Sequence, residues 1–147
     1  MAWGDVDAFW MAREKILKHP GKHNLENFLC KIIRKHYGAG ISILYDINRF
    51  ETPHGFYGIF ISQRAKVGEG CVIYQQVTIG SNDLQNSPGG APTIGNNCLI
   101  GAGAKIIGNV NIGNNVRIGA NTIVVDDVPD NSTVVMNKPR VICRKNK

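Results

Sequence analysis

The sequence predicts a mainly β protein in which a parallel β-helix follows a short α-helical segment. Three features carry this prediction: an aliphatic residue recurs every six positions, glycine often follows it, and a small or β-branched residue lies four positions after it. A period of six fits neither an α-helix, with its period of 3.6, nor a single strand, with its period of 2. It fits a coil in which each six-residue unit is a short strand plus a corner, and three units close one triangular turn.

The aliphatic positions run from Ile61 to Val124 and are expected to point into the prism, each stacking on its counterpart in the next coil. They are Ile61, Val67, Ile73, Ile79, Ile94, Ile100, Ile106, Ile112, Ile118 and Val124. Cys71 and Cys98 occupy the small-residue position, so we expect both to be buried and inert. The four cysteines form no CxxC pair, which argues against a zinc cluster or a disulfide framework.

Residues 1–40 are predicted to form a short helical N-terminal segment of two helices. The first has Asp5 as its N-cap and ends before Pro20, and the second begins at Asn24 and ends at Gly38. Both carry apolar stripes that are expected to dock on the rest of the protein. The stripes are Val6, Phe9, Trp10, Ile16 and Leu17 in the first helix and Leu25, Phe28, Leu29, Ile32 and Ile33 in the second.

Residues 41–136 are predicted to form the β-helix domain, and 137–147 a basic C-terminal tail. The fifteen positions from Ile79 to Ile94 break the period of six, and the polar, turn-rich residues 81–92 therefore predict a loop extruded from the coil. Such a loop is either a functional flap or a neutral insertion. The ends of a solenoid need covering, and the helices at one end and the tail from Val134 at the other are expected to do this.

Composition narrows the classes of function. The chain has 147 residues and a formal charge of +6, but its basic residues are scattered and do not alternate with aromatic residues, so nucleic-acid binding is not expected. A modest positive field also suits a ligand that carries several phosphates. No apolar run approaches the length of a membrane span and the N-terminus lacks the features of a signal peptide, which predicts a cytoplasmic protein without membrane contact.

The runs IYQQVTIGS (73–81) and IGAGAKIIG (100–108), with the loop ahead of PTIG (92–95), resemble the hexapeptide-repeat acyltransferase superfamily, and most closely its serine acetyltransferase branch. The resemblance covers about residues 41–142. It implies a left-handed coil, a homotrimer with active sites between neighbouring subunits, and acetyl-CoA as acyl donor in a groove between two β-helices. A metal-dependent enzyme on this fold is not expected, because residues 55–147 contain no histidine to serve as a ligand.

Transfer of an acetyl group from a thioester to a hydroxyl needs a general base, and histidine suits that role. Of the four histidines only His54 lies beside the first coils, in a segment similar to the His-containing turn of the family. A loop histidine without a role is the alternative. Asp46 is the expected carboxylate partner, with Glu51 also nearby. No cysteine lies in a nucleophile motif, so direct transfer is favoured over an acyl-enzyme.

The resemblance also implies a set of cofactor contacts. Backbone groups along the pantetheine arm are expected from Ser81, Ala102 and Ala120, and contacts to the phosphates from Arg117, Lys138 and Arg140.

The acceptor is where this chain departs from the family. Serine acetyltransferases carry an Asp directly before the catalytic His and an Arg-His pair before the Pro that ends the loop, and here these positions hold Pro53, Gly90 and Ala91. The missing ionic clamp favours a sugar or polysaccharide precursor over free serine. Loop residues that could bind such a hydroxyl acceptor are Asn82, Asp83, Gln85 and Asn86. A serine O-acetyltransferase and a non-catalytic trimeric scaffold stay open as alternatives.

Overall fold

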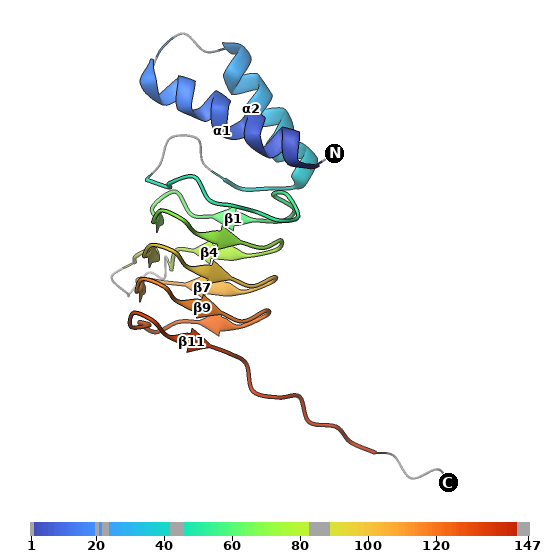
Figure 1. Cartoon of the computed structure of the whole chain (residues 1–147), viewed down its shortest axis with the longest axis vertical. Coiled ribbons are helices and arrows are strands. Elements are labelled where there is room, and N and C mark those ends of the chain that lie inside the picture. The colour runs from blue at the N-terminus through green and yellow to red at the C-terminus, as the bar shows by residue number, and fades with distance from the viewer. Residues whose placement is uncertain (1, 20, 22–23, 42–45, 83–88, 144–147) are drawn as a thin grey trace.

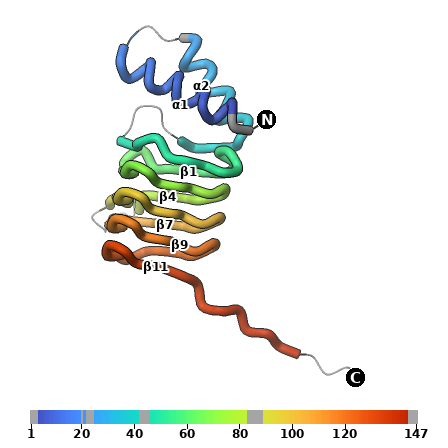
Figure 2. The backbone as a smooth tube through the Cα atoms, viewed as in Figure 1, coloured from blue at the N-terminus to red at the C-terminus, as the bar shows by residue number. Residues whose placement is uncertain are grey.

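The computed structural model describes the whole chain except residues 1, 20, 22–23, 42–45, 83–88 and 144–147. Over the described residues the chain forms a left-handed parallel β-helix with two helices across its N-terminal end (Figure 1). The fold class predicted from the period of six is therefore confirmed. The tube in Figure 2 follows successive triangular coils from the helices down to the last strand.

The strands form three parallel sheets, one on each face of the prism, which we name A, B and C. Sheet A consists of β1 (Phe60–Ile61), β4 (Thr78–Gly80), β7 (Lys105–Ile107) and β10 (Ile123–Val124). Sheet B consists of β2 (Lys66–Val67), β5 (Thr93–Ile94) and β8 (Asn111–Ile112). Sheet C consists of β3 (Val72–Ile73), β6 (Leu99–Ile100), β9 (Arg117–Ile118) and β11 (Thr133–Val134).

The aliphatic positions stack as the period predicts. In sheet C, Ile73 pairs in register with Ile100, and Ile100 pairs with Ile118. All ten predicted positions are buried, with at most 5% of any side chain exposed. Because neighbouring coils repeat the same side chain at the same place, the interior is a set of continuous aliphatic columns.

The turns between sheets form three edges of the prism. We name the edge made by residues 52–59, 74–77, 101–104 and 119–122 the C–A corner, and the edge made by 62–65, 81–82, 89–92, 108–110 and 125–127 the A–B corner. Asparagine tolerates positive φ, which tight corners require. Asn97, Asn115, Asn121 and Asn131 adopt it, with φ between 56° and 59°.

Helices α1 (Ala2–Lys18) and α2 (Asn24–Tyr37) close the N-terminal end of the prism. α1 begins at Ala2 rather than after an N-cap at Asp5, which instead lies in its first turn. Phe9 and Trp10 of α1 pack edge-to-face on Phe56 and Phe50, with ring centroids 5.1 and 5.2 Å apart. Aromatic contacts of this geometry join the helices firmly to the first coil.

The stripe predicted for α2 is mostly wrong. The buried side chains of α2 are Cys30, Ile33 and Tyr37, whereas Leu25, Phe28, Leu29 and Ile32 are between 38% and 75% exposed. The reason is that α1 and the coil contact α2 along the line of Cys30, Ile33 and Tyr37, so the apolar stripe lies one helical face away. Neither helix, over the residues that are described, is long and apolar enough to cross a membrane.

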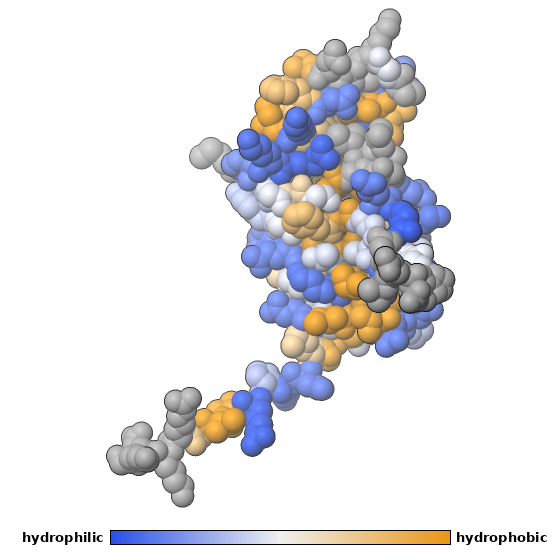
Figure 3. Space-filling view, turned by 180° about the vertical axis from the view of Figure 1, so that it is seen from behind, coloured by the Kyte–Doolittle hydropathy of each residue, from blue (hydrophilic) through white to orange (hydrophobic). Residues whose placement is uncertain are grey.

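The tail does not cover the last coil. After β11 the chain runs away from the prism, and residues 135–143 are all exposed (Figures 1 and 3). Val141 and Ile142 are 84% and 71% exposed, so no part of the chain that the structure describes buries them. The expectation that the segment from Val134 caps the solenoid is therefore wrong for the isolated chain.

Candidate active site

His54 lies on the first turn of the C–A corner, between the bridge of Glu51 to Val72 and strand β1. Two hydrogen bonds close this turn: the Thr52 hydroxyl donates to the Gly55 carbonyl at 2.5 Å, and the Gly55 N–H donates to the Thr52 carbonyl at 3.2 Å. The His54 side chain itself is exposed. A short turn tied at both ends thus presents the imidazole to solvent.

The end of α2 holds this turn against the coil. The Gly58 N–H donates to the Tyr37 carbonyl at 3.0 Å. Gly55 has φ of 76°, and a Cβ there would lie 2.7 Å from the Tyr37 ring. Only glycine meets both conditions without strain, so the sequence Pro-His-Gly suits a His54 turn packed directly on the helix.

The partner of the His54 ring is an amide. Nδ1 of His54 lies 2.9 Å from Oε1 of Gln75, and the ring stands edge-on to Tyr74 with centroids 5.8 Å apart. An amide oxygen only accepts hydrogen bonds, so Nδ1 carries the proton and Nε2 is left unprotonated in the neutral ring. That tautomer is the one a general base needs if Nε2 faces the substrate.

Gln75 and Tyr74 were not among the residues expected at the site. A signal for them existed, because residues 74–77 form the turn of the C–A corner that follows the His54 turn, one coil further on. The Gln76 N–H donates to the Tyr57 carbonyl at 2.8 Å, which fixes the two turns on each other. The corner was therefore predictable, but the regular repeat of eighteen positions pairs Gln75 with Tyr57, so it could not identify Gln75 as the partner of His54.

Ala102 and Ala120 lie on the same corner as His54, one and two coils beyond Gln75. Backbone hydrogen bonds link the turns: Gly103 N–H donates to the Gln75 carbonyl at 3.0 Å and Asn121 N–H to the Ala102 carbonyl at 2.8 Å. The row of turns from His54 through Gln75 and Ala102 to Ala120 spans three coil steps of about 4.8 Å, or about 14 Å in all. Its small side chains leave the backbone open to a thin ligand that ends at the imidazole.

Asp46 does not come together with His54. Its carboxylate Oδ2 lies 3.6 Å from Nζ of Lys66, and its backbone carbonyl accepts a hydrogen bond from Val67, at the start of sheet B. Asp46 thus lies on the face of sheet B, whereas His54 lies on the C–A corner, after the bridge of Glu51 to Val72 in sheet C. The orienting contact expected from Asp46 is made by Gln75 instead.

Of the loop residues expected at the site, the structure describes Ser81 and Asn82, which lie on the A–B corner and not beside His54. Ser81 and Asn82 follow β4 directly, and the Asn82 N–H donates to the Gly90 carbonyl at 3.0 Å, which closes the base of the loop. Asp83, Gln85 and Asn86 lie outside the described residues. Within one chain, His54 therefore lies on the C–A corner and the base of the loop on the A–B corner, with sheet A between them.

The basic residues expected at the phosphates are also dispersed. Arg117 lies on β9 and is exposed on the outside of sheet C, in register with Leu99. Lys138 and Arg140 lie on the extended tail, clear of the chain's own C–A corner (Figure 1). Any contact between the tail and a ligand on such a corner would have to involve another copy of the chain.

The cysteines within the coils are packed rather than poised for reaction. The Cys71 and Cys98 thiols donate to the carbonyls of Gly95 and Gly113 at 3.2 and 3.1 Å, and at most 1% of either residue is exposed. A hydrogen bond between the two side chains lowers the pKa of the Cys98 thiol to about 7 and, with burial, raises the pKa of Cys71. Burial still keeps both sulfurs away from a substrate.

Comparisons with known proteins agree with this fold. Residues 91–126 match the family described as bacterial transferase hexapeptide (six repeats). A serine acetyltransferase of Synechococcus elongatus is 50% identical over 91 residues, which are 62% of this chain and 36% of that protein. Residues 91–126 thus have the repeats of this transferase family, and the chain resembles the serine acetyltransferases.

Solved structures give the same result. A serine acetyltransferase of Entamoeba histolytica in complex with cysteine superposes with a TM-score of 0.73 at 32% identity, covering 95% of this chain and 49% of that one. One of Neisseria gonorrhoeae in complex with serine gives 0.71 at 30% identity, covering 94% and 56%. The chain spans about half the length of the relatives it matches, or less.

Proposed function

We propose that this chain, whose hexapeptide repeats and coil resemble those of serine acetyltransferases, is an acetyl-CoA-dependent O-acetyltransferase with His54 as general base. The proposal rests on the arrangement of residues at the C–A corner. There an exposed imidazole, oriented by Gln75, stands at the end of a row of small residues that includes Ala102 and Ala120. Such a row suits an extended thioester arm whose reactive end lies at the base.

The chemistry needs little from the protein. Nε2 of His54 takes the proton of the acceptor hydroxyl as its oxygen attacks the thioester carbonyl carbon. The carbon–sulfur bond then breaks, and the thiolate of CoA leaves with the proton returned from the imidazolium. During both steps the amide of Gln75 holds the Nδ1 proton, so the ring keeps one orientation.

We further propose that the site is completed by a second copy of the chain in a homotrimer. The loop base on the A–B corner and His54 on the C–A corner flank sheet A, so one chain cannot bring them to the same ligand. Sheet A also exposes apolar side chains, with Phe60 52% and Ile123 68% exposed. A cyclic trimer buries such a face and sets the A–B corner of one chain against the C–A corner of the next.

L-serine is the first acceptor to test, because the relatives are named serine acetyltransferases and one was solved with serine. This favours the serine alternative over the sugar acceptor expected from the sequence. A sugar hydroxyl is the second candidate, supported by Pro53, Gly90 and Ala91, none of which carries a charge for an amino acid.

The test is release of free thiol from acetyl-CoA with L-serine and with sugar acceptors, for the wild type and for His54→Ala. The wild type is expected to turn over, and the variant to lose a factor of about 10²–10⁴ because the general base is gone. Circular dichroism and sedimentation show whether the variant keeps its fold and trimer. Undiminished turnover by a folded His54→Ala contradicts the proposal, and no turnover by the wild type with any acceptor supports a scaffold.

A further inference from the structure

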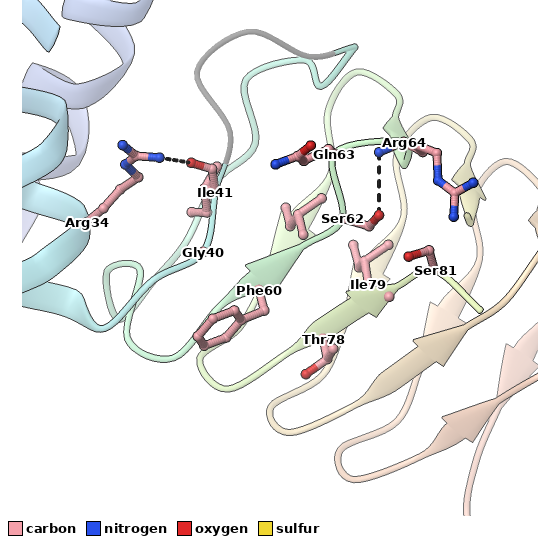
Figure 4. A pocket seen from close by; sticks show the side chains of 12 residues that line it. Arg34, Gly40, Ile41, Phe60, Ser62, Gln63, Arg64, Thr78, Ile79 and Ser81 are labelled. Carbon is pink, nitrogen blue, oxygen red and sulfur yellow. Dashed lines mark hydrogen bonds between the residues drawn. The ribbon is translucent and has the colours of Figure 1, made fainter. Parts of the chain in front are cut away.

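A second site lies on the A–B corner, where α2 meets the first two coils. It is a cavity of about 670 Å³, within the size range of small-molecule pockets. Figure 4 shows it between α2 and the ends of β1 and β4. Its lining residues are Arg34, Gly40, Ile41, Phe60, Ile61, Ser62, Gln63, Arg64, Thr78, Ile79, Gly80 and Ser81. The catalytic steps described so far use none of these residues, although Ser81 was expected along the pantetheine arm and Phe60 belongs to the exposed face of sheet A.

The pocket has the chemistry of an anion site. Two arginines, Arg34 and Arg64, line it at opposite ends, and Ser81 lies on the side of Arg64 (Figure 4). No Asp or Glu is among the described lining residues. Arginine is the side chain best matched to a carboxylate or a phosphate, because its planar fork offers several N–H donors.

The coil contacts Arg34 through its side chain and Arg64 through its backbone. Nη1 of Arg34 donates to the Ile41 carbonyl at 3.2 Å, while its Nε is buried and has no hydrogen-bond partner among the described residues. The backbone N–H of Arg64 lies 3.4 Å from the Ser62 hydroxyl, which braces the corner that carries the guanidinium. Because this Nε is closed off from solvent, an anion in the pocket would meet the terminal Nη groups of the guanidinium groups instead.

We propose that this pocket binds the anionic group of the acceptor, a carboxylate or a phosphate, and that Arg64 is its main contact. This inference rests on the proposed acetyltransferase function and adds the class of substrate: small hydroxyl compounds that carry an oxyanion. His54 lies on the turn just before β1, and Arg64 lies on the turn just after it, so the two residues belong to the same coil and flank sheet A. In a trimer the Arg64 of one chain therefore faces the His54 of its neighbour, with the acceptor between them.

Direct binding tests the pocket independently of any activity. Inorganic phosphate, titrated calorimetrically against the wild-type protein, is expected to bind, and Arg64→Gln should weaken that binding about tenfold or more. Arg49→Gln is the matched control, because Arg49 is an exposed arginine that pairs with Asp7 outside the pocket. Equal binding by wild type and Arg64→Gln overturns the proposal, as does an equal loss in Arg49→Gln.

Kinetics then distinguish the two sources of the anion. Matched pairs are L-serine against serinol, which lacks the carboxylate, and glucose 6-phosphate against glucose. The anionic member of one pair should be preferred by the wild type, and Arg64→Gln should raise its KM about tenfold while leaving the KM of acetyl-CoA unchanged. Equal use of both members of each pair contradicts the inference, whereas no turnover with any acceptor contradicts the proposed function and leaves the phosphate titration to decide the pocket.

Mixed trimers test the placement of the pocket across the interface. His54→Ala and Arg64→Gln, each impaired alone, are mixed, unfolded and refolded together. Random assembly gives about a quarter of the interfaces an intact His54 facing an intact Arg64, and activity should recover to about that share. The two variants refolded separately are the controls. No recovery on mixing shows that the two residues do not meet across chains.

Discussion

The hydrogen bond from His54 to Gln75 gives the most specific prediction about the site. Gln75→Leu removes the acceptor at 2.9 Å from Nδ1 and leaves the size of the side chain nearly unchanged. Without that acceptor the imidazole can rotate and can place its proton on either nitrogen. Only a fraction of the molecules then presents an unprotonated Nε2 to the acceptor hydroxyl.

The size of the effect follows from the bond. A neutral hydrogen bond between partly exposed groups contributes about 0.5–1.5 kcal/mol. Since 1.36 kcal/mol corresponds to a factor of ten in rate, kcat should fall by about two- to twelvefold in Gln75→Leu. That is well short of the loss of about 10²–10⁴ expected when the base itself is removed in His54→Ala.

Steady-state thiol release measures this difference. kcat should fall in Gln75→Leu while the KM of acetyl-CoA stays within about twofold, because the row of small residues that binds the arm is untouched. Gln75→Glu keeps an accepting oxygen at the same position and should retain most of the activity. A fall in Gln75→Leu as large as in His54→Ala, or a change confined to KM, refutes the orienting role.

Three further predictions concern the coil. Ile100→Ala removes a fully buried side chain between Ile73 and Ile118 and should lower the free energy of unfolding in urea by about 2–5 kcal/mol. This is more than twice the loss expected in Leu99→Ala, whose side chain points outward on the same strand. Equal losses in the two variants contradict the inward stacking. Gly103→Ala adds a Cβ at φ of 72° and should destabilise by about 1–3 kcal/mol, whereas Gly4→Ala, in open space on α1, should stabilise. A thiol reagent should label Cys143 alone in the native protein and all four cysteines after unfolding, and rapid labelling of a second thiol would show that the coils open.

The β-helix could be predicted from the sequence because each coil repeats one local rule. An inward aliphatic side chain, a small residue at the corner and glycine or asparagine at positive φ together determine the next six residues. Ile94 and Ile112 illustrate this, since both pair in register within sheet B although the extruded loop comes just before Ile94. The repeat frame survives the loop because each rung is bonded to the rungs above and below it.

The first coil could not be predicted in the same way. Gly40 pairs with Phe60 twenty positions on, and Glu51 with Val72 twenty-one positions on, whereas regular coils repeat after eighteen, as Phe60 does with Thr78. Here the packing of α2 sets the register, through contacts such as that of Tyr37 with Gly55. This is why His54 was found while its partner was not.

The central claim is that His54 is the general base for acetyl transfer from a thioester that binds along the C–A corner, between two copies of the chain. A crystal structure of the protein with CoA bound tests it most directly. The account predicts that the CoA sulfur lies within about 4 Å of Nε2 of His54, that the arm follows Ala102 and Ala120, and that a second chain closes the groove with its A–B corner. CoA bound on another edge of the prism, or a C–A corner with no neighbouring chain beside it, would contradict the account.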